Sequence, residues 1–191
     1  MGRPSLAPQR TLELLDAVDR VILRDGVTAT TVAAVAREAG TQPSLVHHYL
    51  GTRSQVLDAA VRRILQRVED VLYAALTDVA EADRLDAQLD VLFGPALDNP
   101  LIEQMVEHLV VASYRDPQIR DRLTVLYQRF ADIIRASLVM ARPDLSPSQA
   151  QALSHAIVAL AHSAPTLAWL RLDHGVGPAL RTAAHVLVTR P

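Results

Sequence analysis

Cysteine is absent from this 191-residue chain, and so is lysine, because all nineteen basic residues are arginine. Without cysteine the protein has no disulfide, no thiolate zinc site and no cysteine nucleophile. A chain whose basic residues are all arginine is typical of a GC-rich genome and says little about function. Aromatic residues make up only 4% of the chain, which predicts that any ligand pocket is lined mostly by aliphatic side chains.

Several functional signatures are missing as well. No uninterrupted apolar run approaches 18 residues, so we expect no membrane-spanning helix. The first ten residues, MGRPSLAPQR, lack the apolar segment of a secretory signal, which predicts a cytoplasmic protein. The sequence has no nucleophile–base–acid set, no glycine-rich phosphate loop and no HExxH pattern. We therefore expect neither an enzyme nor a bound metal or cofactor.

Helical periodicity dominates the chain, and no segment has the alternation of a strand. Half of the residues are apolar, which is enough to bury a core. The pattern predicts an all-α protein of about nine helices, over residues 8–25, 31–38, 42–49, 53–79, 82–93, 98–114, 117–141, 146–172 and 176–189. Pro165 falls inside an apolar run and is expected to kink or divide its helix.

The stretch 27–57 is the most informative part of the sequence. Thr30 and Thr31 offer an N-cap hydroxyl, and Gly40 ends the helix that follows. A second short helix starts directly after that glycine and ends at Gly51. Two short helices around a glycine-containing turn form a helix-turn-helix, which places its second helix in the DNA major groove.

The distribution of charge agrees with this interpretation. Residues 1–67 hold nine arginines and six acidic residues, a net charge of +3, whereas residues 68–191 carry a net charge of −5. A basic excess around the helix-turn-helix suits contact with phosphates. A solvated helix surface can also have an excess this small, so charge alone does not decide the function.

The order of residues over about 10–57 is specific as a whole. It consists of Leu14, Leu15, Ala17, Gly26, Thr31-Val32, Val35-Ala36, Ala39-Gly40, Pro43 to Leu50, Gly51-Thr52-Arg53 and Val56-Leu57. This pattern resembles the tetracycline-repressor (TetR) family of bacterial transcription regulators. Leu50 stands where the family usually has Phe, and it can fill the same place in the core. Arg53 stands where the family usually has Lys, and it keeps a positive charge that can bind a phosphate. His47 and Tyr49 depart where sequence would be recognised, so the base contacts do not carry over in detail.

The chemistry of the helix-turn-helix points to its DNA-facing side. Thr31 presents a hydroxyl and free N–H groups where a phosphate can dock. Pro43 and Ser44 are small enough for close approach to bases, whereas Tyr49 and Arg53 suit backbone phosphates. We therefore predict DNA contacts by Thr31, Gln42, Pro43, Ser44, His47, His48, Tyr49 and Arg53. The alternative for each of these residues is a helix cap or a solvated surface position.

The resemblance implies two domains: a DNA-binding domain over 1–55 and a helical effector-binding and dimerisation domain over 56–191. The helices 146–172 and 176–189 are expected to form a dimer bundle through the apolar residues Leu153, Ile157, Leu160, Leu167, Leu170, Leu180, Ala184, Leu187 and Val188. The alternative is that these residues belong to the core of the monomer.

A ligand pocket is expected among the central helices, where polar or aromatic residues interrupt apolar stretches. Its predicted residues are Gln104, Met105, His108, Tyr127, Phe130, His162 and Trp169, although any one of them can equally be a core residue. The leading hypothesis is a homodimeric, nucleoid-associated repressor that an unknown small molecule releases from a palindromic operator in double-stranded DNA. The competing hypothesis is an all-helical protein-interaction scaffold that binds no DNA.

Overall fold

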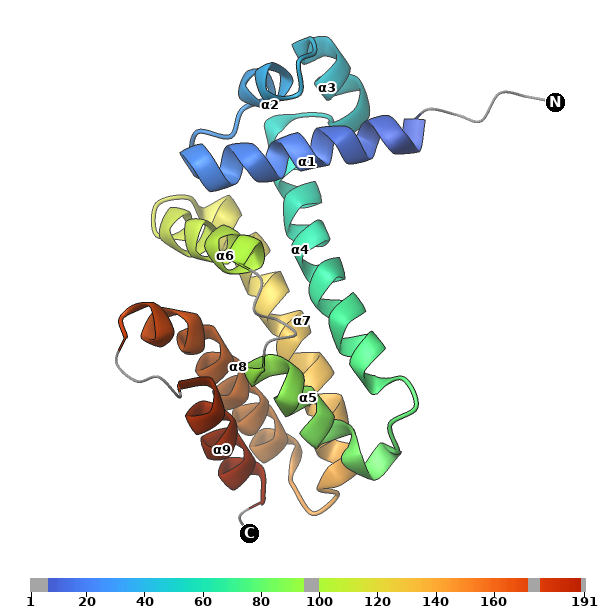
Figure 1. Cartoon of the computed structure of the whole chain (residues 1–191), viewed down its shortest axis with the longest axis vertical. Coiled ribbons are helices and arrows are strands. Elements are labelled where there is room, and N and C mark those ends of the chain that lie inside the picture. Colours follow the sequence, from blue (N-terminus) through green and yellow to red (C-terminus); the bar gives the residue numbers. More distant parts are fainter. Residues whose placement is uncertain (1–6, 95–99, 172–175, 190–191) are drawn as a thin grey trace, which may run out of the picture. The chain divides into compact units, whose positions relative to one another are not determined.

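Helices make up the regular structure of the chain. The computed structural model describes residues 7–94, 100–171 and 176–189, and within them lie nine α-helices and one short 3-10 helix (Figure 1). No strand occurs in these ranges. The all-α fold class predicted from the periodicity is confirmed.

The helices begin and end close to the predicted positions. They are α1 (Ala7–Asp25), α2 (Val32–Glu38), α3 (Pro43–Leu50), α4 (Arg53–Leu76), the 3-10 helix η1 (Glu81–Asp83), α5 (Arg84–Phe93), α6 (Pro100–Ser113), α7 (Pro117–Ala141), α8 (Pro147–Trp169) and α9 (Val176–Thr189). α4 is slightly shorter than predicted because the chain turns soon after it, at Asp78, whose φ is 64°. Aspartate is one of the few residues besides glycine that visit this left-handed region.

Pro165 does not divide its helix. α8 continues from Pro147 to Trp169 with Pro165 inside it, so of the two predicted effects the division does not occur, and the kink stays a prediction. Proline lacks the N–H that would donate to the carbonyl of Ala161, but its fixed φ is itself helical. One lost hydrogen bond in a helix of 23 residues leaves enough of the ladder for the helix to continue.

The chain forms two compact units. The first consists of residues Met1–Gln66 and Pro100–Leu123, so it contains α1, α2, α3, the start of α4, α6 and the start of α7. In this unit α1 packs against α2, α3 and α6. Its buried apolar side chains include Val18, Ile22, Val35, Val46, Leu57, Ile64, Met105 and Leu109.

The second unit consists of residues Arg67–Asn99 and Thr124–Pro191. Here α9 packs against both α5 and α8. One apolar cluster joins four helices of this unit through Leu85, Leu89, Phe93, Ile134, Leu138, Ala150, Ile157, Ala184 and Val188. α4 and α7 contribute residues to both units.

The boundaries of these units differ from the functional boundary predicted after residue 55. Residues 100–123 belong to the same compact unit as the helix-turn-helix, although they follow it by fifty residues in the chain. The functional division at residue 55 stays a prediction. Among the described helices, none has the length and apolar character to cross a membrane.

Candidate nucleic-acid interface

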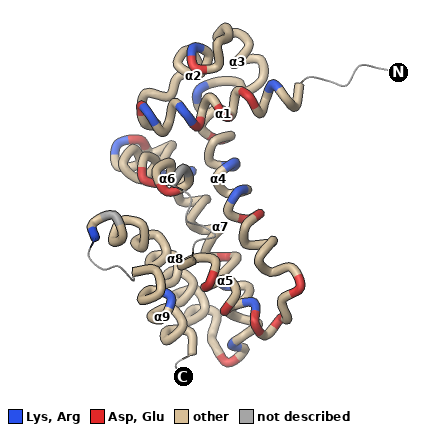
Figure 2. The backbone as a smooth tube through the Cα atoms, in the orientation of Figure 1, with Lys and Arg blue, Asp and Glu red and all other residues tan. Residues whose placement is uncertain are grey.

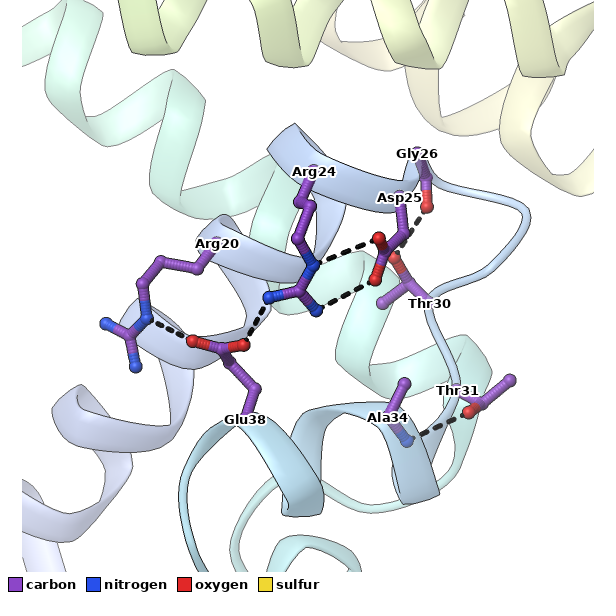
Figure 3. A network of polar contacts seen from close by, with 8 residues as sticks. All are labelled: Arg20, Arg24, Asp25, Gly26, Thr30, Thr31, Ala34 and Glu38. Atoms are coloured by element: carbon purple, nitrogen blue, oxygen red, sulfur yellow. Dashed lines mark hydrogen bonds and ion pairs between the residues drawn. The ribbon is translucent and has the colours of Figure 1, made fainter.

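The first helix of the helix-turn-helix is capped as its sequence predicts. Thr31 is the N-cap of α2, and its hydroxyl accepts a hydrogen bond from the backbone N–H of Ala34 at 3.0 Å (Figure 3). The preceding residue, Thr30, is fully buried and donates its hydroxyl to the carbonyl of Gly26 at 3.0 Å. The two threonines therefore have different roles: Thr30 fixes the loop between α1 and α2, and Thr31 starts α2.

The turn between the two helices is a closed glycine C-cap. The N–H of Gly40 donates to the carbonyl of Arg37 at 3.2 Å, and the N–H of Thr41 donates to that of Ala36 at 2.9 Å. This pair of bonds is the Schellman motif, which requires a left-handed residue. Gly40 supplies it with a φ of 62°. The angle at which α3 leaves α2 is set by this motif.

The second helix, α3, has a buried face and an exposed face. Val46 and Leu50 are buried in the unit. The residues predicted to contact DNA lie mostly on the other face, since Gln42, Pro43, Ser44, His47 and His48 are all exposed. Pro43 stands in the first turn, where its missing N–H leaves no hydrogen bond unmade. The helix therefore presents a small, proline-led N-terminus followed one turn later by two imidazoles.

The aromatic side chains at the end of α3 are held locally. Nδ1 of His47 lies 3.1 Å from the carbonyl oxygen of Gly51, which closes the last turn of the helix. The rings of His48 and Tyr49 meet edge to face with their centroids 4.9 Å apart. Tyr49 is half-buried, whereas both histidines are exposed. The histidines are thus more accessible to a partner than the tyrosine.

Arg53 has a structural role that the sequence did not reveal. Its Nε donates to the carbonyl of Thr30 at 2.8 Å, and its Nη2 donates to the carbonyl of Val27 at 3.0 Å. The first residue of α4 therefore holds the loop that precedes α2. A guanidinium carries five N–H groups, so three remain for another acceptor. Contact of Arg53 with a phosphate stays a prediction.

A cluster of ion pairs connects the ends of α1 and α2 (Figure 3). Glu38 accepts hydrogen bonds from Nε of Arg20 at 2.7 Å and from Nη1 of Arg24 at 2.6 Å. Arg24 also pairs with Asp25 at 2.8 Å. The hydrogen bond from Arg24, and after it the one from Arg20, lowers the pKa of Glu38. The same neighbouring arginine lowers the pKa of Asp25.

These ion pairs limit which arginines of the basic excess are available to bind DNA. Figure 2 shows basic and acidic residues interleaved along α1. Arg20, Arg24 and Arg53 all bind groups of the protein itself, and Arg63 pairs with Asp16 and Asp19. Arginines held by such partners are therefore less available to a phosphate backbone, although pairing with acids leaves the net charge of +3 unchanged. Arg20 and Arg24 stand one helical turn apart, which is the sequence signal that could have revealed the cluster.

The residues predicted to form a ligand pocket fall in both units. In the first unit Met105 is fully buried and Gln104 is exposed. His108 lies against the loop after α1, because a Cβ on Gly26 would be 3.6 Å from its Nδ1. His108 thus packs beside the helix-turn-helix.

Three pocket residues of the second unit do meet. The hydroxyl of Tyr127 lies 2.6 Å from Nδ1 of His162, and the ring of Phe130 has its centroid 6.4 Å from that of Tyr127. Burial raises the pKa of Tyr127 to about 12, so the phenol is neutral and its O–H can donate a hydrogen bond to the imidazole. The side chain of Trp169, the remaining predicted pocket residue, lies outside the described residues.

The apolar residues predicted to form a dimer face differ in burial. Ile157, Ala184 and Val188 are buried in the core of the second unit. Leu153, Leu160 and Leu180 pack against that core, and Leu167 is half-buried. Leu170 and Leu187 remain 51% and 40% exposed. Part of the predicted face therefore serves the monomer, as the alternative interpretation has it, and two large side chains remain for a partner.

The comparisons with known proteins agree on one family. Residues 14–60 match the family model described as bacterial regulatory proteins, tetR family. Over 151 residues the chain is 33% identical to the HTH-type transcriptional regulator BetI of Rhizobium meliloti (strain 1021), a match that covers 78% of this chain and 71% of the relative.

Solved structures have the same fold. A TetR transcription regulator from Haloarcula marismortui superposes with a TM-score of 0.75 at 20% identity, covering 95% of this chain and 97% of that chain. A protein from Saccharomonospora viridis, solved in complex with choline, superposes with a TM-score of 0.72 at 20% identity, covering 95% and 96%. At this identity the likeness concerns the fold alone.

Proposed function

Since the chain belongs to the TetR family of bacterial transcriptional regulators and carries the family's DNA-binding helix-turn-helix, we propose that it is a dimeric repressor that a small-molecule effector releases from a palindromic operator. The family is one of regulators and not of enzymes. Membership favours DNA binding over the competing scaffold hypothesis. The protein would act in the cytoplasm, on the chromosome.

The observation that carries the proposal is the exposed face of α3 between two fixed ends. Pro43, Ser44, His47 and His48 are exposed together; the Schellman turn at Gly40 precedes this helix, and Arg53, directly after it, is bound to the loop before α2. A recognition helix needs this combination, because side chains must meet base edges in a fixed register.

We assign different roles to these residues. Ser44 and His48 lie one helical turn apart and can donate to or accept from base edges, and Pro43 offers an apolar contact to a thymine methyl group. Thr31, at the N-terminus of α2, and Tyr49 would bind backbone phosphates, which position the protein without recognising sequence. Gln42 and His47 flank the same surface.

The dimer gives the operator its symmetry. Two recognition helices about 34–36 Å apart would match half-sites separated by one turn of DNA. The exposed Leu170 and Leu187 of the second unit support α8 and α9 as the dimer helices. A homodimer of this kind uses the same surface on both subunits, so the operator would be a palindrome.

Release by an effector requires two conformations with different operator affinity. To change operator occupancy from nearly complete to nearly zero, the effector must bind the released conformation about 10⁴-fold more tightly than the DNA-binding one, or by roughly 5.5 kcal/mol. α4 and α7 each have residues in both units, so movement of either helix would reach the helix-turn-helix. The choline complex belongs to the Saccharomonospora protein and supports only a small molecule as the class of effector.

An electrophoretic mobility-shift titration tests the proposal. The probe is double-stranded DNA from the region upstream of the gene, against a scrambled duplex of equal length. We expect retardation of the specific probe and a steep fall in affinity with salt. Ser44→Ala and His48→Ala should change the preference among probe sequences, whereas Gln151→Ala, an exposed change on α8, should not. Equal affinity for both duplexes under all conditions would contradict the proposal.

A further inference from the structure

One buried amide in the second unit has no partner. Gln88 of α5 is 2% exposed, and its Oε1 accepts no hydrogen bond within the part of the chain that the structure describes. Most buried side-chain polar atoms in proteins are hydrogen-bonded, because burying an unpaired amide disfavours the folded state. An exception in a regulator's second unit calls for a ligand or a water molecule at that oxygen.

A second unpaired group lies one helical turn away. Arg84 precedes Gln88 by four residues, so their Cβ atoms are about 5–6 Å apart on the same face of α5. Nε of Arg84 is buried and has no partner in the described ranges, although the side chain as a whole is half-buried. No hydrogen bond joins Arg84 to Gln88. An N–H donor and a carbonyl acceptor thus lie unused on one face.

The carboxylates of α5 do not neutralise Arg84. Asp90 pairs with Arg181 of α9 at 2.7 Å, and Asp86 lies 3.0 Å from Nδ1 of His185. At about 100° per residue these two acids stand about 200° and 240° around the helix from Arg84. The acidic face of α5 is therefore occupied by α9, and the face of Arg84 and Gln88 points another way.

That face is nevertheless covered by protein. Val91 lies about 20° from Arg84 around the helix axis and is only 4% exposed. It is not a member of the apolar cluster that Leu85 and Leu89 form with α7, α8 and α9. Gln88 is about 60° around the helix from Val91 and about 60° from Leu85, so the unpaired amide is buried at the edge of this cluster.

We propose that Gln88 and Arg84 form the polar end of the effector site and select a small carboxylate that also bears a hydrogen-bond donor. The guanidinium of Arg84 binds the carboxylate, as its planar fork suits that group. Oε1 of Gln88 accepts from a hydroxyl or amine about one helical turn away. The assignment rests on the proposed function for the term effector, while the binding itself requires no DNA.

The charge of the site discriminates between ligand classes. Within the part of the chain that the structure describes, no ion pair neutralises Arg84, and such an arginine attracts an anion and repels a cation that lacks a carboxylate. Choline, a bare cation, should therefore not bind at this end of the site. 3-Hydroxybenzoate carries both required groups, and benzoate carries only the carboxylate.

Calorimetric titration of the full chain with millimolar 3-hydroxybenzoate, benzoate and choline tests the assignment. We expect the wild-type protein to bind 3-hydroxybenzoate at least about tenfold more tightly than benzoate, the effect of one good hydrogen bond, and not to bind choline. Gln88→Met should abolish the preference for the hydroxyl, and Arg84→Met should weaken both carboxylates. Gln151→Met is the matched control, because Gln151 is exposed on α8.

Thermal unfolding without ligand supplies a second measurement. Replacing an unpaired buried amide by methionine, which has a similar shape, should leave the melting temperature unchanged or raise it. An unaltered preference in Gln88→Met, or no binding of 3-hydroxybenzoate by the wild-type chain, overturns the assignment, as does binding of choline that Arg84→Met leaves intact. Binding of operator DNA is measured separately. An error in the proposed regulatory function and an error in the proposed ligand site therefore give different results.

Discussion

At the scale of single residues, the helix-turn-helix depends on a few positions where the backbone conformation restricts the choice of residue. Gly40 is the plainest case, because its φ of 62° suits glycine and nothing lies within 4 Å of the place where a Cβ would stand. Substitution there adds backbone strain without a steric clash. A substitution at Gly40 therefore measures the energetic cost of the left-handed conformation without a contribution from packing.

We predict that Gly40→Ala destabilises the first unit by about 1 kcal/mol, the usual cost of a left-handed conformation for an L-residue. For unfolding of the whole 191-residue chain, that corresponds to a fall of about 2–4 °C in melting temperature. Gly40→Asn is the control, because asparagine adopts the left-handed region more readily. Thermal denaturation followed by circular dichroism checks both. Equal losses for the two variants would point to a cause other than φ.

Glu38 gives a pH-dependent prediction at the same scale. The hydrogen bonds from Arg24 and Arg20 lower its pKa in the folded protein below the ordinary value of 4.5. Because the folded form holds the ionised carboxylate, the stabilisation is complete above 4.5 and is lost as the pH falls through the lowered folded pKa. Glu38→Gln should thus be less stable than the wild type at pH 7, and this difference should shrink as the pH falls below 4.5.

Melting temperatures of both proteins across that pH range measure the difference. Glu107→Gln, a change at an exposed position of α6, is the control and should track the wild type. High salt should also narrow the gap for Glu38→Gln, since exposed ion pairs are screened. A difference in melting temperature that stays constant as the pH falls below 4.5 would mean that the side chain acts through packing and not through charge.

At the scale of elements, periodicity and punctuation were sufficient to place the helices. Apolar spacing, threonine caps and glycine stops are local signals, and they predicted α2 and α3 within a residue of their ends. The sequence could not decide whether Pro165 kinks or divides its helix, because the local effect of one proline does not take account of the other hydrogen bonds of a long helix. The contacts of Arg53 could not be predicted, and the spacing of Arg20 and Arg24 did not identify Glu38 as their shared acid, since these partners lie more than a dozen residues apart. Such contacts depend on how the elements pack.

Arg53 provides the test at this scale, because it is both a helix-start residue and a predicted phosphate contact. Arg53→Ala removes the donors to the carbonyls of Val27 and Thr30, both of which are buried residues. We predict a loss of about 1.5–3 kcal/mol, the range for hydrogen bonds to a charged group. Urea denaturation measures the free energy of unfolding of the variant and the wild type.

Arg53→Lys distinguishes the loop contact from a phosphate contact. Lysine keeps the charge but cannot reach two carbonyls with a planar fork. If the residue only holds the loop, both this variant and Arg53→Ala lose stability and keep the wild-type dependence of operator affinity on salt. If it also binds a phosphate, Arg53→Ala lowers the slope of that dependence by about 1 while Arg53→Lys retains it. Mobility-shift titrations at several salt concentrations decide between these outcomes.

At the scale of the whole molecule, operator binding and assembly are expected to be linked. A palindrome is bound by two helix-turn-helix units at once, so the second contact is effectively intramolecular and can add about 10²–10⁴ to the affinity. A monomer with an intact α3 would lose that gain. In the proposed repressor, assembly is therefore expected to determine operator affinity together with the recognition helix.

Leu187 tests this link, because it is 40% exposed on α9 and belongs to the proposed dimer face. We predict that Leu187→Glu shifts the protein from dimer to monomer in sedimentation velocity, since it would place two like charges in a symmetric interface. The variant should weaken operator binding at least tenfold, within the avidity gain above, with unchanged thermal stability of the monomer. Thr182→Glu, about 140° away around the helix and also exposed, should leave the dimer intact. A dimeric Leu187→Glu protein with full operator affinity would show that α9 assembles through another face or not at all.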